Sequence, residues 1–147
     1  MTMQRFILNK VKGTKELLQK IIKTFKDLNP VSIAQFGSGT YGFRDEFSDL
    51  DLWITFPDER INQFVLDRVK IYEDIAPILI RHESPKNSPI GGRYTLVIYE
   101  TEFGLFHVDY YLAKESNLVT MDYLENDFKL LFGESHLPKG KWKTDQT

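Results

Sequence analysis

The stretch SDLDLWITF, residues 48–56, alternates apolar and other side chains as a β-strand does. The apolar side chains share one face of this strand and are Leu50, Leu52, Ile54 and Phe56. Asp49 and Asp51 share the other face, although aspartate is depleted in strands. Their Cα atoms lie about 7 Å apart, so the two carboxylates repel each other. Such a face is either solvated or holds a cation between the two aspartates.

The segments on either side predict alternating helices and strands. Strands are expected at residues 31–36, 48–56, 77–82, 94–99 and 105–112, the last two forming a hairpin. Helices are expected at residues 14–28, from Pro57 through Tyr72, and at 121–132 with Gly133 as a cap. This order predicts an α/β (α+β) fold with a small mixed sheet of about four to five strands flanked by helices.

The composition bounds the kind of protein. The chain has 147 residues, of which 41% are hydrophobic and 14% aromatic, and this predicts a packed core. A net charge of −2 argues against a large nucleic-acid surface, and the absence of cysteine excludes thiol catalysis and disulfides. The sequence shows neither a membrane-spanning run nor a secretory signal, so a cytoplasmic location is expected. We expect one domain over residues 1–135 and a frayed tail over 136–147.

A glycine-rich turn, QFGSGTYG, precedes the strand with the aspartates. Gly37, Gly39 and Gly42 match the dinucleotide fingerprint G-x-G-x-x-G, but only FRDEF separates Gly42 from Ser48, which leaves no room for the required helix. A P-loop is excluded because Phe43 follows Gly42 where lysine is required. Taken alone, the glycines indicate only a turn that needs positive φ.

The turn and the aspartates together suggest a metal and phosphate site. The backbone N–H groups at Gly37-Ser38 and the serine hydroxyl can face an anion. Magnesium prefers a few carboxylates plus substrate phosphates, so Asp49 and Asp51 would form a metal clamp beside this turn.

A third carboxylate of the kind that two-metal sites use lies in the run GLFHVDYYLA. Its apolar side chains alternate inward, whereas His107, Asp109 and Tyr111 face the other way. Asp109 is a lone acid in a strongly β-forming segment. It is either an exposed sheet position or the third ligand of the metal site.

A Gly-Ser turn, a D-x-D strand and an acid in a later apolar strand resemble the nucleotidyltransferase superfamily typified by DNA polymerase β. The nearest resemblance is to small bacterial antibiotic nucleotidyltransferases and to minimal nucleotidyltransferase domains. It implies that Gly37 and Ser38 hold a triphosphate and that Asp49 and Asp51 bind the metals. It also implies that Asp109 completes the metal site and helps to deprotonate the acceptor hydroxyl.

The resemblance covers roughly residues 14–112. Many minimal members have a basic residue where Tyr41 stands. Either Arg44 replaces it as a nucleotide contact, or the loop follows the shorter GSxxxG variant of the antibiotic enzymes. Lys86 and Arg93 are further candidates to contact the triphosphate, although each alone is as well explained by an ordinary solvated charge.

Two other residues share the aspartate face. His107 either contacts the nucleotide or the acceptor, or is a plain surface histidine. Trp53 either stacks on a base or packs against the following helix.

The implied chemistry is nucleotidyl transfer with a pair of Mg²⁺ ions and ATP or another NTP as co-substrate. The expected acceptor is the hydroxyl of a small molecule, such as an aminoglycoside or lincosamide antibiotic, which would confer antibiotic resistance. Two alternative functions remain: a toxin–antitoxin enzyme that modifies a helical protein partner, and a non-catalytic nucleotide-binding module. A homodimer that completes its cleft with a second subunit is expected. Neither a membrane nor a nucleic acid is expected as a partner.

Overall fold

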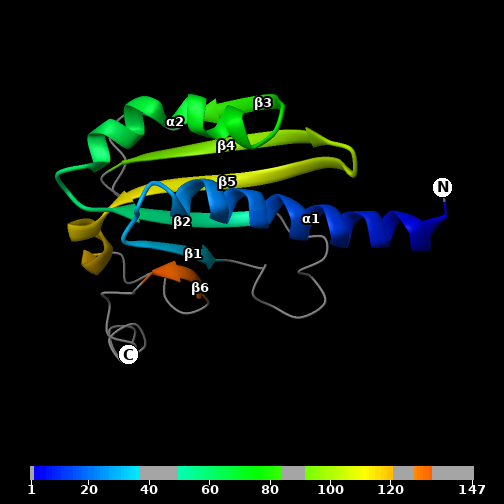
Figure 1. Cartoon of the computed structure of the whole chain (residues 1–147), viewed down its shortest axis with the longest axis horizontal. Helices are drawn as coiled ribbons and strands as arrows, with labels where there is room; N and C mark the ends of the chain where they lie inside the picture. Colours follow the sequence, from blue (N-terminus) through cyan, green and yellow to red (C-terminus); the bar gives the residue numbers. More distant parts are fainter. Residues whose placement is uncertain (1, 37–49, 84–91, 121–127, 134–147) are drawn as a thin grey trace.

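The computed structural model describes residues 2–36, 50–83, 92–120 and 128–133, which fold into a six-stranded sheet with two α-helices (Figure 1). The strands are β1 Ser32–Phe36, β2 Leu50–Phe56, β3 Ile78–Glu83, β4 Arg93–Thr101, β5 Gly104–Lys114 and β6 Phe128–Gly133. The helices are α1 Met3–Lys26 and α2 Ile61–Ile75, and a short 3₁₀ helix, η3, covers Glu115–Thr120. This confirms the predicted mixed α+β fold.

The strand order in the sheet is β3-β4-β5-β2-β1-β6. The neighbouring strands β2 and β5 are parallel, whereas the other pairs are antiparallel. The predicted hairpin is confirmed as β4 and β5, which meet at the turn where Thr101 pairs with Gly104. The chain passes from β2 to β5 through α2, β3 and β4, so β5 lies between β4 and β2 at the centre of the sheet.

Helix α1 begins earlier than the sequence predicted. Thr2 caps it by accepting a hydrogen bond from the Arg5 backbone N–H at 3.1 Å. Gly13 is buried within the helix, where an added Cβ would lie 2.4 Å from the Phe106 ring and 2.7 Å from Phe103 Cβ. Glycine therefore allows α1 to approach the β4–β5 hairpin closely, which is why this residue does not mark a helix boundary.

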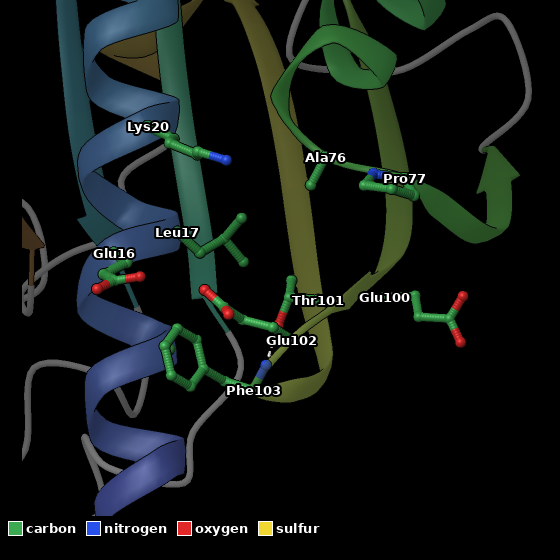
Figure 2. A pocket seen from close by; sticks show the side chains of 10 residues that line it. Glu16, Leu17, Lys20, Ala76, Pro77, Glu100, Thr101, Glu102 and Phe103 are labelled. Atoms are coloured by element: carbon green, nitrogen blue, oxygen red, sulfur yellow. Dashed lines mark hydrogen bonds between the residues drawn. The ribbon is translucent and has the colours of Figure 1, made fainter.

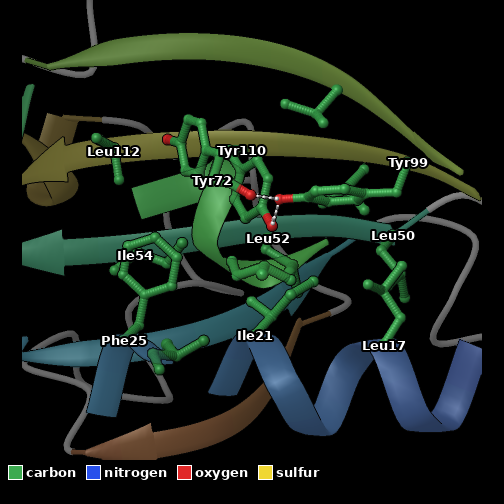
Figure 3. Close-up of a cluster of buried hydrophobic side chains, with 14 of the residues drawn as sticks. Leu17, Ile21, Phe25, Leu50, Leu52, Ile54, Tyr72, Tyr99, Tyr110 and Leu112 are labelled. Carbon is green, nitrogen blue, oxygen red and sulfur yellow. Dashed lines mark hydrogen bonds between the residues drawn. The ribbon is translucent and has the colours of Figure 1, made fainter. Parts of the chain in front are cut away.

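Both helices cover the same face of the sheet, and the hydrophobic core lies between the helices and the sheet (Figure 3). Leu17, Ile21 and Phe25 of α1 point towards the apolar side chains of β2. Beside them, Tyr110 stacks on Tyr72 with ring centroids 4.0 Å apart. This face buries the apolar side chains that the alternation predicted for β2 and β5.

A cluster of three tyrosines brings hydroxyl groups into this core. The Tyr99 hydroxyl donates to the Tyr72 carbonyl oxygen at 2.9 Å and lies 2.8 Å from the Tyr110 hydroxyl. All three side chains are fully buried. Because buried hydroxyls are costly unless they are hydrogen-bonded, these contacts help to fix β4, β5 and α2 relative to one another.

The predicted last helix is wrong where the structure describes it. Residues 128–133 form β6, which pairs antiparallel with β1. Gly133 has a φ of +83° and lies against the Val31 carbonyl, so it ends this strand rather than capping a helix. Pairing with an otherwise open sheet edge decides the conformation here, and it adds a strand to the number expected. Residues 121–127 and the predicted tail at 136–147 lie outside the described residues.

Within the described segments, no helix combines the length and the apolar character needed to cross a membrane.

Candidate active site

Two of the three predicted acids meet on the central pair of strands. Asp51 of β2 and Asp109 of β5 are direct partners in the parallel ladder. Paired residues project from the same face of a sheet, and Leu52 and Tyr110, the next pair along, project into the core. Asp51 and Asp109 therefore share the face opposite to the helices. Asp49, the third predicted acid, lies outside the described residues.

This face is not simply solvated. The Asp109 side chain is 15% exposed, and Trp53 and Thr55 of β2 are buried on the same side as Asp51. Asp109 Oδ1 accepts a hydrogen bond from the Tyr94 hydroxyl at 2.5 Å and lies 3.0 Å from His107 Nε2. The interpretation of Asp109 as an exposed sheet position is therefore wrong.

The surroundings of Asp109 favour its ionised form. Burial would raise the pKa of Asp109, but hydrogen bonds with Asp51, Tyr94 and His107 together hold this pKa below its ordinary value. Burial and the hydrogen bond to Asp109 raise the pKa of Tyr94, so its phenol remains a donor. Asp109 is thus an ionised acceptor at neutral pH, held by donors from two strands.

Trp53 does not pack against the following helix, because it lies on the opposite face of the sheet from Leu52 and Ile54, and its stacking on a base stays a prediction. It is 4% exposed, and its ring stacks on Tyr111 with a centroid distance of 4.6 Å. Tyr111 in turn contacts Tyr94 with ring centroids 4.9 Å apart. Trp53, Tyr111 and Tyr94 therefore form a row of three rings across β2, β5 and β4, beside the two aspartates.

Arg93 lies on the wrong face to contact a nucleotide bound at the aspartates. It pairs with Leu112, whose side chain is in the core, so Arg93 projects to the helix-covered side. There its Nη1 lies 3.9 Å from Glu83 Oε2. Glu83 also accepts hydrogen bonds from Arg68 Nε at 2.5 Å and Arg68 Nη2 at 3.1 Å, and it pairs with Arg81. This ion-pair cluster connects α2, β3 and β4 and is structural.

The cluster makes stability depend on pH. Burial would raise the pKa of Glu83, but the hydrogen bond and charge of Arg68 lower it below its ordinary value of 4.5. Ionised Glu83 therefore stabilises the fold above that pH, and its contribution is lost as the pH falls through the lowered pKa. We expect Glu83→Gln to reduce the free energy of unfolding by about 2 kcal/mol at pH 7, and by progressively less in acid.

Urea unfolding at several pH values measures this effect. Glu73→Gln, at an exposed position on α2, serves as the matched control and should change stability by less than about 0.5 kcal/mol. A loss in Glu83→Gln that stays constant as the pH falls would show that shape, not charge, determines the effect.

The remaining predicted nucleotide contacts are not placed. Gly37, Ser38, Arg44 and Lys86 lie outside the described residues, as Asp49 does. Their roles remain predictions. Sequence reasoning missed Tyr94, which could have been found by extending the predicted hairpin register from its turn, since Tyr94 pairs with Tyr111.

The fit of a divalent cation can be judged from the donors that are present. No three His, Asp or Glu side chains within the described ranges are arranged to hold a metal ion. Asp51 and Asp109 nevertheless place two carboxylates side by side, and carboxylate oxygens are the ligands that Mg²⁺ prefers. A cation would also remove the repulsion between two ionised groups. The pair is therefore suited to hold part of a metal site.

A pocket of about 340 Å³ lies elsewhere, between α1, the junction of α2 with β3, and the β4–β5 hairpin (Figure 2). Leu17 and Phe103 line it, and Glu16, Glu100 and Glu102 outnumber Lys20 among its charged side chains. It lies on the helix-covered side of the sheet, away from Asp51 and Asp109. With one lysine against three glutamates, this pocket offers little positive charge to a triphosphate.

We compared the chain with curated proteins and with models of protein families. A comparison with curated proteins finds no significant match. A family model described as "Nucleotidyltransferase domain" matches residues 18–132, a span that contains both Asp51 and Asp109, strands β1 to β5 and all of β6 except Gly133. Because this match covers more than half of the sequence, the chain belongs to the nucleotidyltransferase domain family, whose activity is the transfer of a nucleoside monophosphate from an NTP.

Proposed function

We propose that the protein transfers AMP from ATP to a hydroxyl group of a small molecule, with an aminoglycoside or a lincosamide as the first candidate acceptor. The observation that carries the proposal is the register of β2 against β5, which places Asp51 beside Asp109 on a protected face. This pair lies within the span that matches the nucleotidyltransferase domain. The net charge of −2 favours a small acceptor over a nucleic acid.

Each predicted residue has a role in this proposal. Gly37, Ser38 and Arg44 would bind the triphosphate, and Asp49, Asp51 and Asp109 would hold a pair of Mg²⁺ ions. When bound, such ions activate the acceptor hydroxyl and neutralise charge on the departing pyrophosphate.

Two described side chains orient Asp109, and Asp109 itself can accept a proton. Tyr94 and His107 both engage Oδ1 of Asp109, so Oδ2 is the oxygen of this carboxylate that neither of them holds. Asp109 is also the proposed acceptor of the proton of the acceptor hydroxyl. The aromatic row, in which Trp53 is buried and the two tyrosines are half-buried, would shield one side of the site from water.

Incubation with ATP labelled at the α-phosphate, Mg²⁺ and a panel of hydroxylated antibiotics tests the proposal. The expected result is label on one of the small molecules, with one pyrophosphate released for each transfer. GTP, CTP and UTP in parallel reactions identify the nucleotide, and EDTA should stop the reaction.

Two other outcomes would overturn the proposal. Label on an added protein instead of a small molecule would show a protein-modifying enzyme. ATP binding without pyrophosphate release, across the whole panel and with cell proteins present, would show a nucleotide-binding module.

A further inference from the structure

Two of the three hydrogen-bond partners of Asp109, Tyr94 and His107, converge on one of its two oxygens, and the third partner is Asp51. The Tyr94 hydroxyl donates to Oδ1 at 2.5 Å, and His107 Nε2 lies 3.0 Å from the same atom. The two contacts come from different strands, because Tyr94 lies on β4 and His107 lies on β5 itself. A carboxylate held at one oxygen by two neighbours has a fixed plane, and its other oxygen has a fixed direction.

The Tyr94 side chain is itself held in place. Its ring packs against Tyr111 at 4.9 Å, and Tyr111 stacks on Trp53 at 4.6 Å. Trp53 is almost fully buried, so the far end of this row is fixed by the sheet. The phenol therefore reaches Asp109 from a rigid support, and a short hydrogen bond to an ionised acceptor is a strong one.

We propose that Tyr94 is a positioning residue for metal binding. By holding Asp109 Oδ1, it directs Oδ2 towards the cation that Asp109 shares with Asp51. The inference rests on the proposed function, because it assumes that these carboxylates hold a divalent ion. Partners of this kind, which orient a ligating carboxylate without touching the metal, commonly affect metal affinity about 10- to 100-fold.

A second tyrosine on the same strand provides a matched control. The Tyr99 hydroxyl also makes two hydrogen bonds, to the Tyr72 carbonyl and the Tyr110 hydroxyl, but on the core side of β4. Tyr94→Phe and Tyr99→Phe each remove one phenol oxygen and keep the ring. A merely structural role for Tyr94 would make the two variants behave alike.

The experiment measures Mn²⁺ affinity by electron paramagnetic resonance, with and without a non-hydrolysable ATP analogue. We expect Tyr94→Phe to bind Mn²⁺ about 10-fold or more weakly than the original protein, with a nearly unchanged melting temperature. We expect Tyr99→Phe to bind Mn²⁺ normally but to melt at a lower temperature. Asp109→Asn should lose most of the binding.

The outcomes separate this inference from the proposed function. If Tyr94→Phe binds Mn²⁺ as tightly as the original protein while Asp109→Asn does not, the positioning role is wrong and the metal site stands. If Asp109→Asn also binds normally, both the metal site and the positioning role are wrong. Weak binding in both Phe variants, in proportion to their loss of stability, would likewise overturn the positioning role.

Discussion

Asp51→Asn is expected to lower kcat for nucleotidyl transfer by at least about 10³-fold, the scale on which loss of a group that stabilises the transition state acts. Asp51 pairs directly with Asp109, and the two carboxylates interact closely. A neutral amide at this position is a much weaker metal ligand. It can, however, donate a hydrogen bond to Asp109 without the shared proton that two carboxyl groups need for such a bond.

The same substitution should not weaken the fold. In metal-free buffer, we expect the melting temperature of Asp51→Asn to equal or exceed that of the original protein, because the hydrogen bond to Asp109 no longer depends on a proton shared by two carboxyl groups. Steady-state transfer assays and thermal unfolding by circular dichroism measure the two quantities. A variant that retains transfer, or one that melts at a clearly lower temperature, would show that Asp51 has a structural role instead.

The largest expected effect on stability is that of Tyr110→Ala, which should reduce the free energy of unfolding by about 4 kcal/mol. Tyr110 is fully buried, stacks on Tyr72 at 4.0 Å and packs against Phe25 at 6.0 Å. Removing the ring leaves a cavity between β5 and both helices, and it removes the partner of the Tyr99 hydroxyl. Urea unfolding measures the change.

Two further variants separate packing from hydrogen bonding. Tyr110→Phe keeps the ring and should cost only about 1 kcal/mol, since the Tyr99 hydroxyl still donates to the Tyr72 carbonyl. Phe6→Ala removes a ring that is 46% exposed on α1 and should cost less than about 0.5 kcal/mol. If Tyr110→Ala proved no worse than Phe6→Ala, the core could not be centred on the tyrosine cluster.

Alternation of side chains sufficed to predict the strands with one apolar face, because every second side chain of a half-buried strand points into the core and is apolar. Leu50, Leu52 and Ile54 follow this rule, and their strand was predicted. Residues 128–133 do not, since an apolar run at a sheet edge fits a helix as well as a strand. Only the free edge of β1, which local sequence cannot reveal, decides between them.

The candidate site could be predicted only in part, for a similar reason. Asp51 and Asp109 stand out because acids are rare in strongly β-forming segments. Tyr94 and Arg93 are neighbours in the sequence, yet the ladder with β5 places Tyr94 beside Asp109 and Arg93 beside Glu83. A change of register by one residue would exchange their faces, so their roles depend on pairing rather than on residue type.

The parallel pairing of β2 with β5 also limits how early in synthesis Asp51 and Asp109 can come together. The intervening α2, β3 and β4 must be synthesised before Asp109 can reach Asp51. Contacts between segments far apart in the chain form slowly, because closing the loop costs entropy before any contact is made. A nascent chain synthesised only as far as α2 would thus have both helices but still lack its acid pair, because Asp109 follows later in β5.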